Sequence, residues 1–300
     1  MDYFLRLLLS GTAKGSIYAL IALGYTMVYG IVQLINFAHG EIYMIGGFTA
    51  LIIAGSLSAL GLPPGLVLLF SVVVAIVFSS AFGITIERLA YRPLRAKPRL
   101  SALISAIGIS MILQNFVLLA QTEKYLFFPS FLPEFAFLAP VRSYINSTQF
   151  IILITTTVIM IGLTLLIKLT RMGKAMRATA QDRKMAQLLG VNINSVISLT
   201  FVLGSSLAAI GGVLISSYAG QINYYIGFLA GIKAFVAAVL GGIGSIPGAV
   251  LGSYILGLTE SFGTGYITSD YEDAFAFIIL IIILVFKPNG LLGKKENQKV

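Results

Sequence analysis

Long stretches without Asp, Glu, Lys or Arg are the feature that most constrains what this chain can fold into. They cover residues 15–40, 42–86, 100–122, 143–167, 185–232, 234–259 and 274–286. A helix needs about 20 apolar residues to cross about 30 Å of hydrocarbon, so each of the longest stretches has room for two crossings. The stretches are continuous instead of alternating in short segments, which excludes a transmembrane β-barrel. An all-α, polytopic membrane helical bundle is therefore predicted.

Composition supports this class. Hydrophobic residues make up 58% of the 300 residues and charged residues 10%, whereas soluble domains carry about 25% charged residues. No small-residue cleavage site follows the first apolar run, so we expect the N-terminal segment to be retained. The chain has no cysteine and one histidine, and it lacks a GxxxxGK[ST] phosphate loop. We therefore expect no metal site, no catalytic triad and no ATP bound by that motif.

Turn residues divide the longest stretches. GLPPG at 61–65 and SYAGQIN at 217–223 are the natural points for the chain to fold back. About eight or nine transmembrane helices result. If the first three segments all cross the membrane, the chain has nine transmembrane helices and its N-terminus lies outside. If one of these segments is re-entrant, the chain has eight and its N-terminus lies inside. The 31 glycines either serve helix packing or form broken helices around a path.

Basic residues gather in three clusters, which hold 15 of the 20 in the chain, at residues 88–99, 168–184 and 287–299. Positive charge marks the cytoplasmic loops of membrane proteins. These clusters should therefore face the cytoplasm, and residues 122–148 and the acidic tip at 270–273 should face outward. We therefore attribute the net charge of +9 to residues that lie beside membrane lipid, and we expect no nucleic-acid partner.

Two charged residues, Glu41 and Lys233, interrupt otherwise uncharged membrane segments. We interpret Lys233 as a long cation that extends to the membrane interface. INFAHGEIYM at 35–44 places His39 and Glu41 between apolar segments, which favours a helix break and leaves a gate as the alternative. Candidates for a translocation path or gate are Gln33, Asn36, His39, Glu41, Gln114 and Asn115, although such polar residues also serve as interhelical hydrogen-bond partners.

A polar segment at 168–194 separates the apolar stretches. Strong helix formers predict one helix from Lys174 to Leu189 that ends at Gly190. Met185, Leu188 and Leu189 share one face of that helix. The face could dock in a groove on a partner protein, or the helix could lie at the interface with its arginines on lipid phosphates.

This segment resembles the coupling loop of ABC-importer permeases, a short helix that inserts into the ATPase subunit. ATAQD at 178–182 and LGV at 189–191 stand where that family has an alanine-rich motif ending in glycine, and the Glu-Ala-Ala form is absent. The resemblance implies a coupling helix that contains Arg177, Ala178, Ala180, Asp182, Met185, Leu188, Leu189 and Gly190.

The whole chain resembles the LivH-type permease family of high-affinity branched-chain amino-acid importers. The resembling stretches are residues 18–47, 87–95, 103–115, 171–192 and 225–252. The resemblance implies one transmembrane permease domain over 1–300, in the bacterial inner membrane, with a cytoplasmic coupling loop at 168–196 and a cytoplasmic tail at 287–300. It implies a second related permease in a heterodimer, two cytoplasmic ATPase subunits that bind ATP and Mg, and an extracytoplasmic substrate-binding protein. This chain would hold no cofactor and would carry Leu, Ile and Val.

Two other hypotheses stay open. Related permeases for urea or short amides share much of this pattern. A stand-alone channel or secondary carrier for a small neutral solute would need no ATPase and would support passive flux alone. A membrane scaffold without transport is disfavoured, because glycine-broken helices would weaken it with no path to line.

Overall fold

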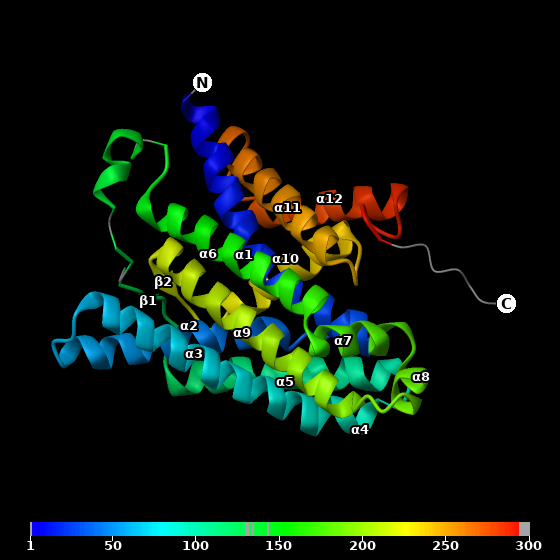
Figure 1. Ribbon diagram of the computed structural model, residues 1–300. Helices are drawn as coiled ribbons and strands as arrows, with labels where there is room; N and C mark the ends of the chain where they lie inside the picture. Colours follow the sequence, from blue (N-terminus) through cyan, green and yellow to red (C-terminus); the bar gives the residue numbers. More distant parts are fainter. Residues whose placement is uncertain (1, 96, 130–131, 134, 143, 294–300) are drawn as a thin grey trace.

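The computed structural model describes residues 2–95, 97–129, 132–133, 135–142 and 144–293, and nearly all of its regular structure is helical (Figure 1). The elements are α1 (Asp2–Val32), α2 (His39–Ala59), α3 (Pro64–Ile86), the π-helix η1 (Glu87–Tyr91), α4 (Arg92–Leu94), α5 (Arg99–Ala120), β1 (Leu126–Phe127), the 3-10 helix η2 (Ala136–Val141), α6 (Ser147–Leu169), α7 (Arg171–Gln181), α8 (Arg183–Leu188), α9 (Ile193–Ala219), β2 (Gln221–Ile222), α10 (Ile226–Gly241), α11 (Ile246–Tyr266) and α12 (Glu272–Phe286).

The predicted helical bundle is confirmed, with a different count of full-length spans. Within the described residues, six helices are long and apolar enough to cross a membrane, and the bent pair α10–α11 raises the number to seven at most. A total of eight or nine therefore requires counting short helices. These are α10, with 16 residues, and α12, with 15, both below the length of about 20 residues that a span needs.

The chain folds back where turn residues predict it. Gly61, at φ +73°, lies between α2 and α3, and Gly220, at φ +68°, ends α9. Gly242 and Gly244, at φ +105° and +90°, lie in the short connection where α10 and α11 bend by 119°. Left-handed backbone of this kind favours glycine. The expected broken segment is thus present, and it lies in GGIGSIPG.

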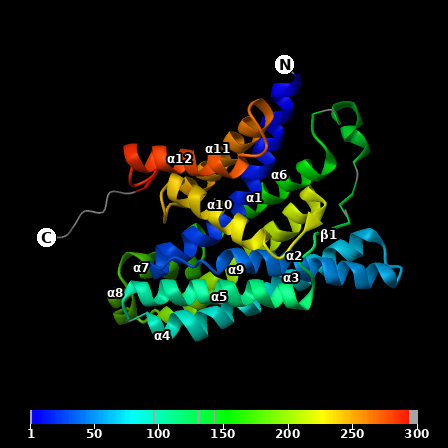
Figure 2. The same cartoon turned by 180° about the vertical axis from the view of Figure 1, so that it is seen from behind.

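Helix α1 forms the centre of the bundle and packs along α11 (Figure 1). Small residues allow the close approach: a Cβ on Gly11 would lie 2.9 Å from the Cα of Leu258, and one on Gly257 would lie 2.4 Å from the backbone nitrogen of Gly15. Glycines four residues apart are a common device for bringing helices together in lipid. By contrast, α5 and α6 expose most of their length, and α5 lies on the outside of the bundle (Figure 2).

The N-terminus lies at the end of the bundle opposite the first two basic clusters. The Tyr144 hydroxyl donates to Asp2 Oδ1 at 3.1 Å, so α1 begins beside the loop after α5. Its last turn contacts Arg183 of α8, and Arg95 reaches Asn194 at the start of α9. The start of α1 and these two clusters therefore lie at opposite ends of the bundle.

Short backbone hydrogen-bonded contacts join segments at the two ends of the bundle. Strands β1 and β2 pair antiparallel, with Leu126 opposite Ile222. At the other end, the backbone N–H groups of Leu291 and Leu292 donate to the carbonyls of Leu240 and Gly241, each at 2.9 Å. They supply partners to carbonyls that the end of α10 leaves free. The predicted tail reaches into residues 294–300, which lie outside the described part of the chain.

Candidate functional site

The polar segment at 168–194 forms two helices, α7 and α8, instead of the single predicted helix from Lys174 to Leu189. Asp182 divides them: its backbone is extended at φ −154° and ψ 110°, and its Oδ1 accepts the backbone N–H of Met185 at 3.0 Å. Aspartate competes for backbone N–H groups and is a preferred N-cap. This cap interrupts a run of helix formers and starts α8.

Helix α8 ends where the sequence predicts. Gly190 has φ +84°, its N–H donates to the Gln187 carbonyl, and the N–H of Val191 donates to the Ala186 carbonyl, both at 3.0 Å. This pair of bonds is a Schellman motif, which favours glycine at that position. The short helix therefore has a defined beginning and end.

Helix α8 turns three apolar side chains away from the bundle. Met185, Leu188 and Leu189 are 55%, 81% and 77% exposed, whereas Ala186 is buried. Among the other predicted coupling residues, Ala180 is exposed and Ala178 half-buried. The guanidinium of Arg177 donates to the Ile167 carbonyl at the end of α6. Among the predicted coupling residues, the exposed large apolar side chains are therefore those of Met185, Leu188 and Leu189.

On the inner side, α8 is fastened to α1. Arg183 Nε and Nη2 both donate to the Ile31 carbonyl, at 3.1 and 2.6 Å. Ile31 lies in the last turn of α1, where carbonyls have no partner within the helix. Donors on a charged group form strong hydrogen bonds, so α8 and the end of α1 are linked directly.

The stretch 33–38 is a break between two helices, as INFAHGEIYM predicts. Gln33 is exposed and has φ +54°. Asn36 is buried, and its Oδ1 accepts the backbone N–H of Ala38 at 3.2 Å. The Tyr91 hydroxyl lies 3.0 Å from the Ile35 carbonyl and 3.2 Å from Asn36 Oδ1, so a tyrosine on η1 holds the middle of the break.

His39 and Glu41 follow in the first turn of α2, and both are almost completely buried. The imidazole of His39 packs edge-on against Tyr25, with ring centroids 4.9 Å apart. Glu41 Oε1 accepts the Ser110 hydroxyl at 3.0 Å. Within the described residues, neither His39 Nε2 nor Glu41 Oε2 has a hydrogen-bond partner. Buried polar atoms without partners are uncommon in native proteins.

The two polar candidates on α5 are separated. Gln114 follows Ser110 by one turn, and its buried Nε2 also has no partner in the described part of the chain. Asn115 is exposed, and its Nδ2 donates to the Met111 carbonyl of its own helix at 2.8 Å. Gln114 thus shares a face with the serine that binds Glu41, and Asn115 does not join them.

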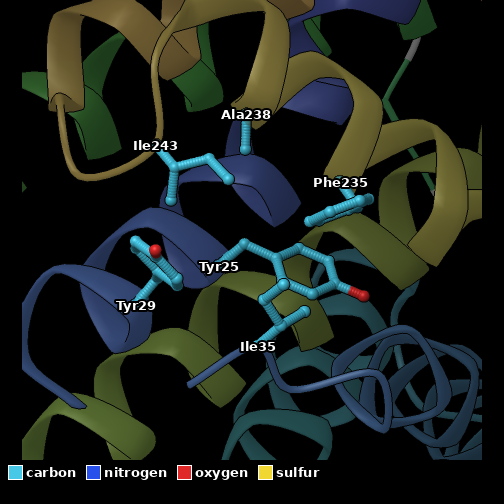
Figure 3. A pocket seen from close by; sticks show the side chains of 6 residues that line it. All are labelled: Tyr25, Tyr29, Ile35, Phe235, Ala238 and Ile243. Atoms are coloured by element: carbon cyan, nitrogen blue, oxygen red, sulfur yellow. The ribbon is translucent and has the colours of Figure 1, made fainter. Parts of the chain in front are cut away.

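A small pocket adjoins the break. Its volume is about 10 Å³, which is room for about one water molecule. Its lining comes from α1, the break, α10 and the α10–α11 connection (Figure 3), through Tyr25, Tyr29, Ile35, Phe235, Ala238 and Ile243. An apolar space therefore separates the end of α1 from the bent pair.

Lys233, which the sequence predicts to extend to the membrane interface, belongs to a cluster of charged residues. Its side chain is 12% exposed, and its Nζ lies 3.1 Å from Glu260 Oε1, 3.5 Å from Glu272 Oε1 and 2.7 Å from Asp273 Oδ1. Lys14 Nζ also pairs with Glu272, at 2.9 Å. The acidic tip thus turns two carboxylates back toward cations on α1 and α10, and an ion cluster joins α1, α10, α11 and α12.

The structure is an all-helical membrane bundle with a broken helix pair and an uncovered apolar face on α8. The family described as "Branched-chain amino acid transport system / permease component" matches residues 7–284. The chain belongs to this family and is a multi-pass protein of the cell membrane.

Individual relatives are similar over nearly their full length. The chain is 49% identical over 302 residues to the high-affinity branched-chain amino acid transport system permease protein LivH of Escherichia coli, covering 99% of this chain and 98% of that protein. It is 51% identical over 305 residues to the corresponding protein BraD of Pseudomonas aeruginosa, with the same coverage, 99% and 98%. A solved structure, described as an inward-facing conformation of a putative metal-chelate type ABC transporter, has a TM-score of 0.50 at 16% identity and covers 94% of this chain and 85% of that one. The last similarity concerns the fold alone.

Proposed function

We propose that this chain is one membrane subunit of an ATP-driven importer for leucine, isoleucine and valine. Family membership supports the cargo class. The structural observation that supports the ATPase partner is the outward face of α8, where Met185, Leu188 and Leu189 are exposed. An apolar helix face of this kind fits a groove on a protein.

A protein groove accounts for α8 better than a lipid surface does. Arg183 and Arg177 are the guanidinium groups nearest this face in sequence, and each donates to a backbone carbonyl of the bundle. Both guanidinium groups therefore bind backbone carbonyls of this chain. Outward, α8 exposes Lys184 beside three large apolar side chains, and those apolar side chains suit a groove on an ATPase subunit better than phosphate headgroups.

The proposed assembly contains a second, related permease as the heterodimer partner, two cytoplasmic ATPase subunits and an extracytoplasmic binding protein that delivers the amino acid. The ATPase subunits bind ATP and Mg, and this chain holds no cofactor. In this proposal residues 1–300 form one transmembrane domain. Its loop at 168–196 and its tail at 287–300 face the cytoplasm.

Transport follows alternating access in this proposal. Closure of the ATPases on ATP displaces α8, and the bundle transmits the displacement to a path between the two permeases. Asn36, His39, Glu41 and Gln114 are proposed to line the gate, since each carries a buried polar atom without a partner among the described residues. Gln33 and Asn115, both exposed, lie at the margins of that region.

The test is Leu188→Glu in the assembled complex. We expect the ATPase subunits to be lost on purification and leucine-stimulated ATP hydrolysis to fall at least about tenfold, because a charge replaces a buried contact in the groove. The melting temperature of the permease should not change, since Leu188 is 81% exposed. Gln187→Glu, on the same helix, is the matched control for added charge. Wild-type hydrolysis in Leu188→Glu would show that the ATPase does not dock on α8.

The competing transport hypotheses are tested with the same material. The permease reconstituted alone should show no leucine flux, whereas a channel would conduct. Uptake of labelled leucine and labelled urea by the full complex decides between the two cargo classes.

A further inference from the structure

We propose that Arg183 and Tyr91 are positioning residues that convert movement of α8 into bending at the helix break of residues 33–38. The inference rests on the proposed function, because it requires an ATPase that moves α8. It assigns a role to two contacts that join segments far apart in the sequence.

In this proposal the contact between Arg183 and Ile31 moves together with α8. Arg183 lies in the first turn of α8, and two of its guanidinium nitrogens donate to the Ile31 carbonyl at 2.6 and 3.1 Å. The opposite face of the same short helix carries the exposed side chains of Leu188 and Met185. A force applied to that face therefore reaches the last turn of α1 directly through the Arg183 side chain, besides the packing of α8 on α7 and α9.

In this proposal the contact between Tyr91 and residues 35–36 stays fixed relative to α9. The ring of Tyr91 is 1% exposed and packs against Phe201 of α9 at a centroid distance of 5.4 Å. Its hydroxyl holds the Ile35 carbonyl and Asn36 Oδ1. Tyr91 ends the π-helix η1, and π-turns within helices occur frequently at functional sites.

The π-helix is itself held on α9. Glu87 is fully buried and accepts hydrogen bonds from Arg92 Nη2 and the Ser198 hydroxyl, both at 2.9 Å, and from Arg95. Arg95 also donates to Asn194 Oδ1 at 2.7 Å. Charged groups that share a buried acceptor make a rigid anchor. Tyr91 thus stays with α9 while α8 moves.

The residues between the two contacts can bend. Ile31 is held by Arg183, and Ile35 and Asn36 are held by Tyr91, which leaves residues 32–34 as the link. Gln33 lies there with φ +54°, a left-handed backbone conformation that raises the free energy of residues other than glycine. Because this conformation is strained, Gln33 needs less free energy to reach another one. Bending at Gln33 would change how α2 enters the bundle at His39 and Glu41.

The test measures leucine imported per ATP hydrolysed by the reconstituted complex with all its subunits. Tyr91→Phe removes one hydroxyl and keeps the buried ring, and Arg183→Met removes the donors from Ile31. For both variants we expect the ATPase subunits to remain bound and hydrolysis to stay within about twofold, while import per ATP falls about fivefold, the effect of one lost hydrogen bond. Arg183→Lys, which keeps a charged donor, should recover part of the loss.

Matched controls separate this role from general packing. Tyr218→Phe removes a hydroxyl that bonds Ser10 elsewhere in the bundle, and Lys174→Met removes an exposed cation from α7. Both should keep the wild-type ratio. Because the chain has no cysteine, Gln33→Cys also gives a single labelling site in this subunit. ATP should change its maleimide labelling in the otherwise wild-type chain and not when Tyr91→Phe is added.

The outcomes separate the inference from the function it rests on. An unchanged import ratio in both Tyr91→Phe and Arg183→Met, with a wild-type complex that imports leucine, overturns the inference and leaves the function standing. A wild-type complex without ATP-driven import overturns the proposed function. If Arg183→Met fails to assemble, Arg183→Lys and Tyr91→Phe decide the question, since each preserves most of the side chain.

Discussion

Two groups of polar residues lie largely inside this bundle, and they differ in whether ion pairs hold them. In the ion cluster, Lys233 contacts three carboxylates, and Glu260 also accepts the Tyr18 hydroxyl at 2.8 Å. In the break region, one polar atom of each of Asn36, His39 and Glu41 has no partner within the described residues. The first group joins four helices, and the second lies where one helix stops and another starts.

The difference suggests which group could rearrange. A cluster held by ion pairs resists rearrangement, because loss of Lys233 would leave the buried charge of Glu260 without its cation. An unpaired buried polar atom costs about 1–3 kcal/mol, so the break region gains free energy in any other state that supplies partners. The break is therefore the candidate for movement, and the ion cluster is the candidate for a fixed frame.

Lys233→Met should have the largest effect on stability. It leaves Glu260, which is 0% exposed, without its direct cation, and breaking a buried pair in this way costs about 3–5 kcal/mol. The melting temperature of the purified complex should fall by several degrees. Adding Glu260→Gln should recover much of the loss, and Lys97→Met, at an exposed position, should change little. A wild-type melting temperature in Lys233→Met would mean that the cluster does not hold the helices.

Glu41→Gln should separate transport from stability. Glutamine keeps the shape and one acceptor for Ser110, so we expect assembly to persist, with a stability change below about 1 kcal/mol. Import should fall about fivefold, because a neutral amide replaces a charged acceptor. Glu123→Gln is the exposed control. His39→Gln should behave as Glu41→Gln does. Lost assembly would favour a structural role for the bend, and unchanged import would exclude the gate.

Gln114→Leu should have the smallest effect, with the opposite sign. Replacing an unpaired buried amide by an apolar side chain of similar size is neutral or stabilising, by up to about 1 kcal/mol. Asn115→Leu, one residue away and exposed, should stay within about 0.5 kcal/mol. Thermal melting of the two variants compares them directly. A clear loss of stability in Gln114→Leu would show that its amide is paired in the folded protein.

Much of the fold follows from local signals. Turns at residues 61–65 and 217–223 depend on glycine and proline, and these signals act within a few residues. The end of α8 at Gly190 is of the same kind. Asp182 was missed, because a side chain that can cap a helix can equally lie on the surface of a continuous one. The number of spans follows only approximately, since an apolar stretch does not reveal how short its helix is.

The site was harder to predict because its contacts join distant residues. The break at INFAHGEIYM follows from the sequence, but Tyr91 is 55 residues from Asn36, and Arg183 is 152 from Ile31. No periodicity encodes such pairs. The partners of Lys233 could not be predicted for the same reason: its three carboxylate partners lie on α11 and α12. The informative signal was Glu260, directly after an uncharged stretch.

The contact between residues 291–292 and the end of α10 has a consequence for biosynthesis. The carbonyls of Leu240 and Gly241 receive their partners from backbone about 50 residues further along the chain. On the ribosome, α10 and α11 therefore emerge and insert while those two carbonyls still lack their protein donors. The bent pair completes its hydrogen bonding only after α12 has been made, so the order of synthesis leaves this connection as one of the last parts of the subunit to become rigid.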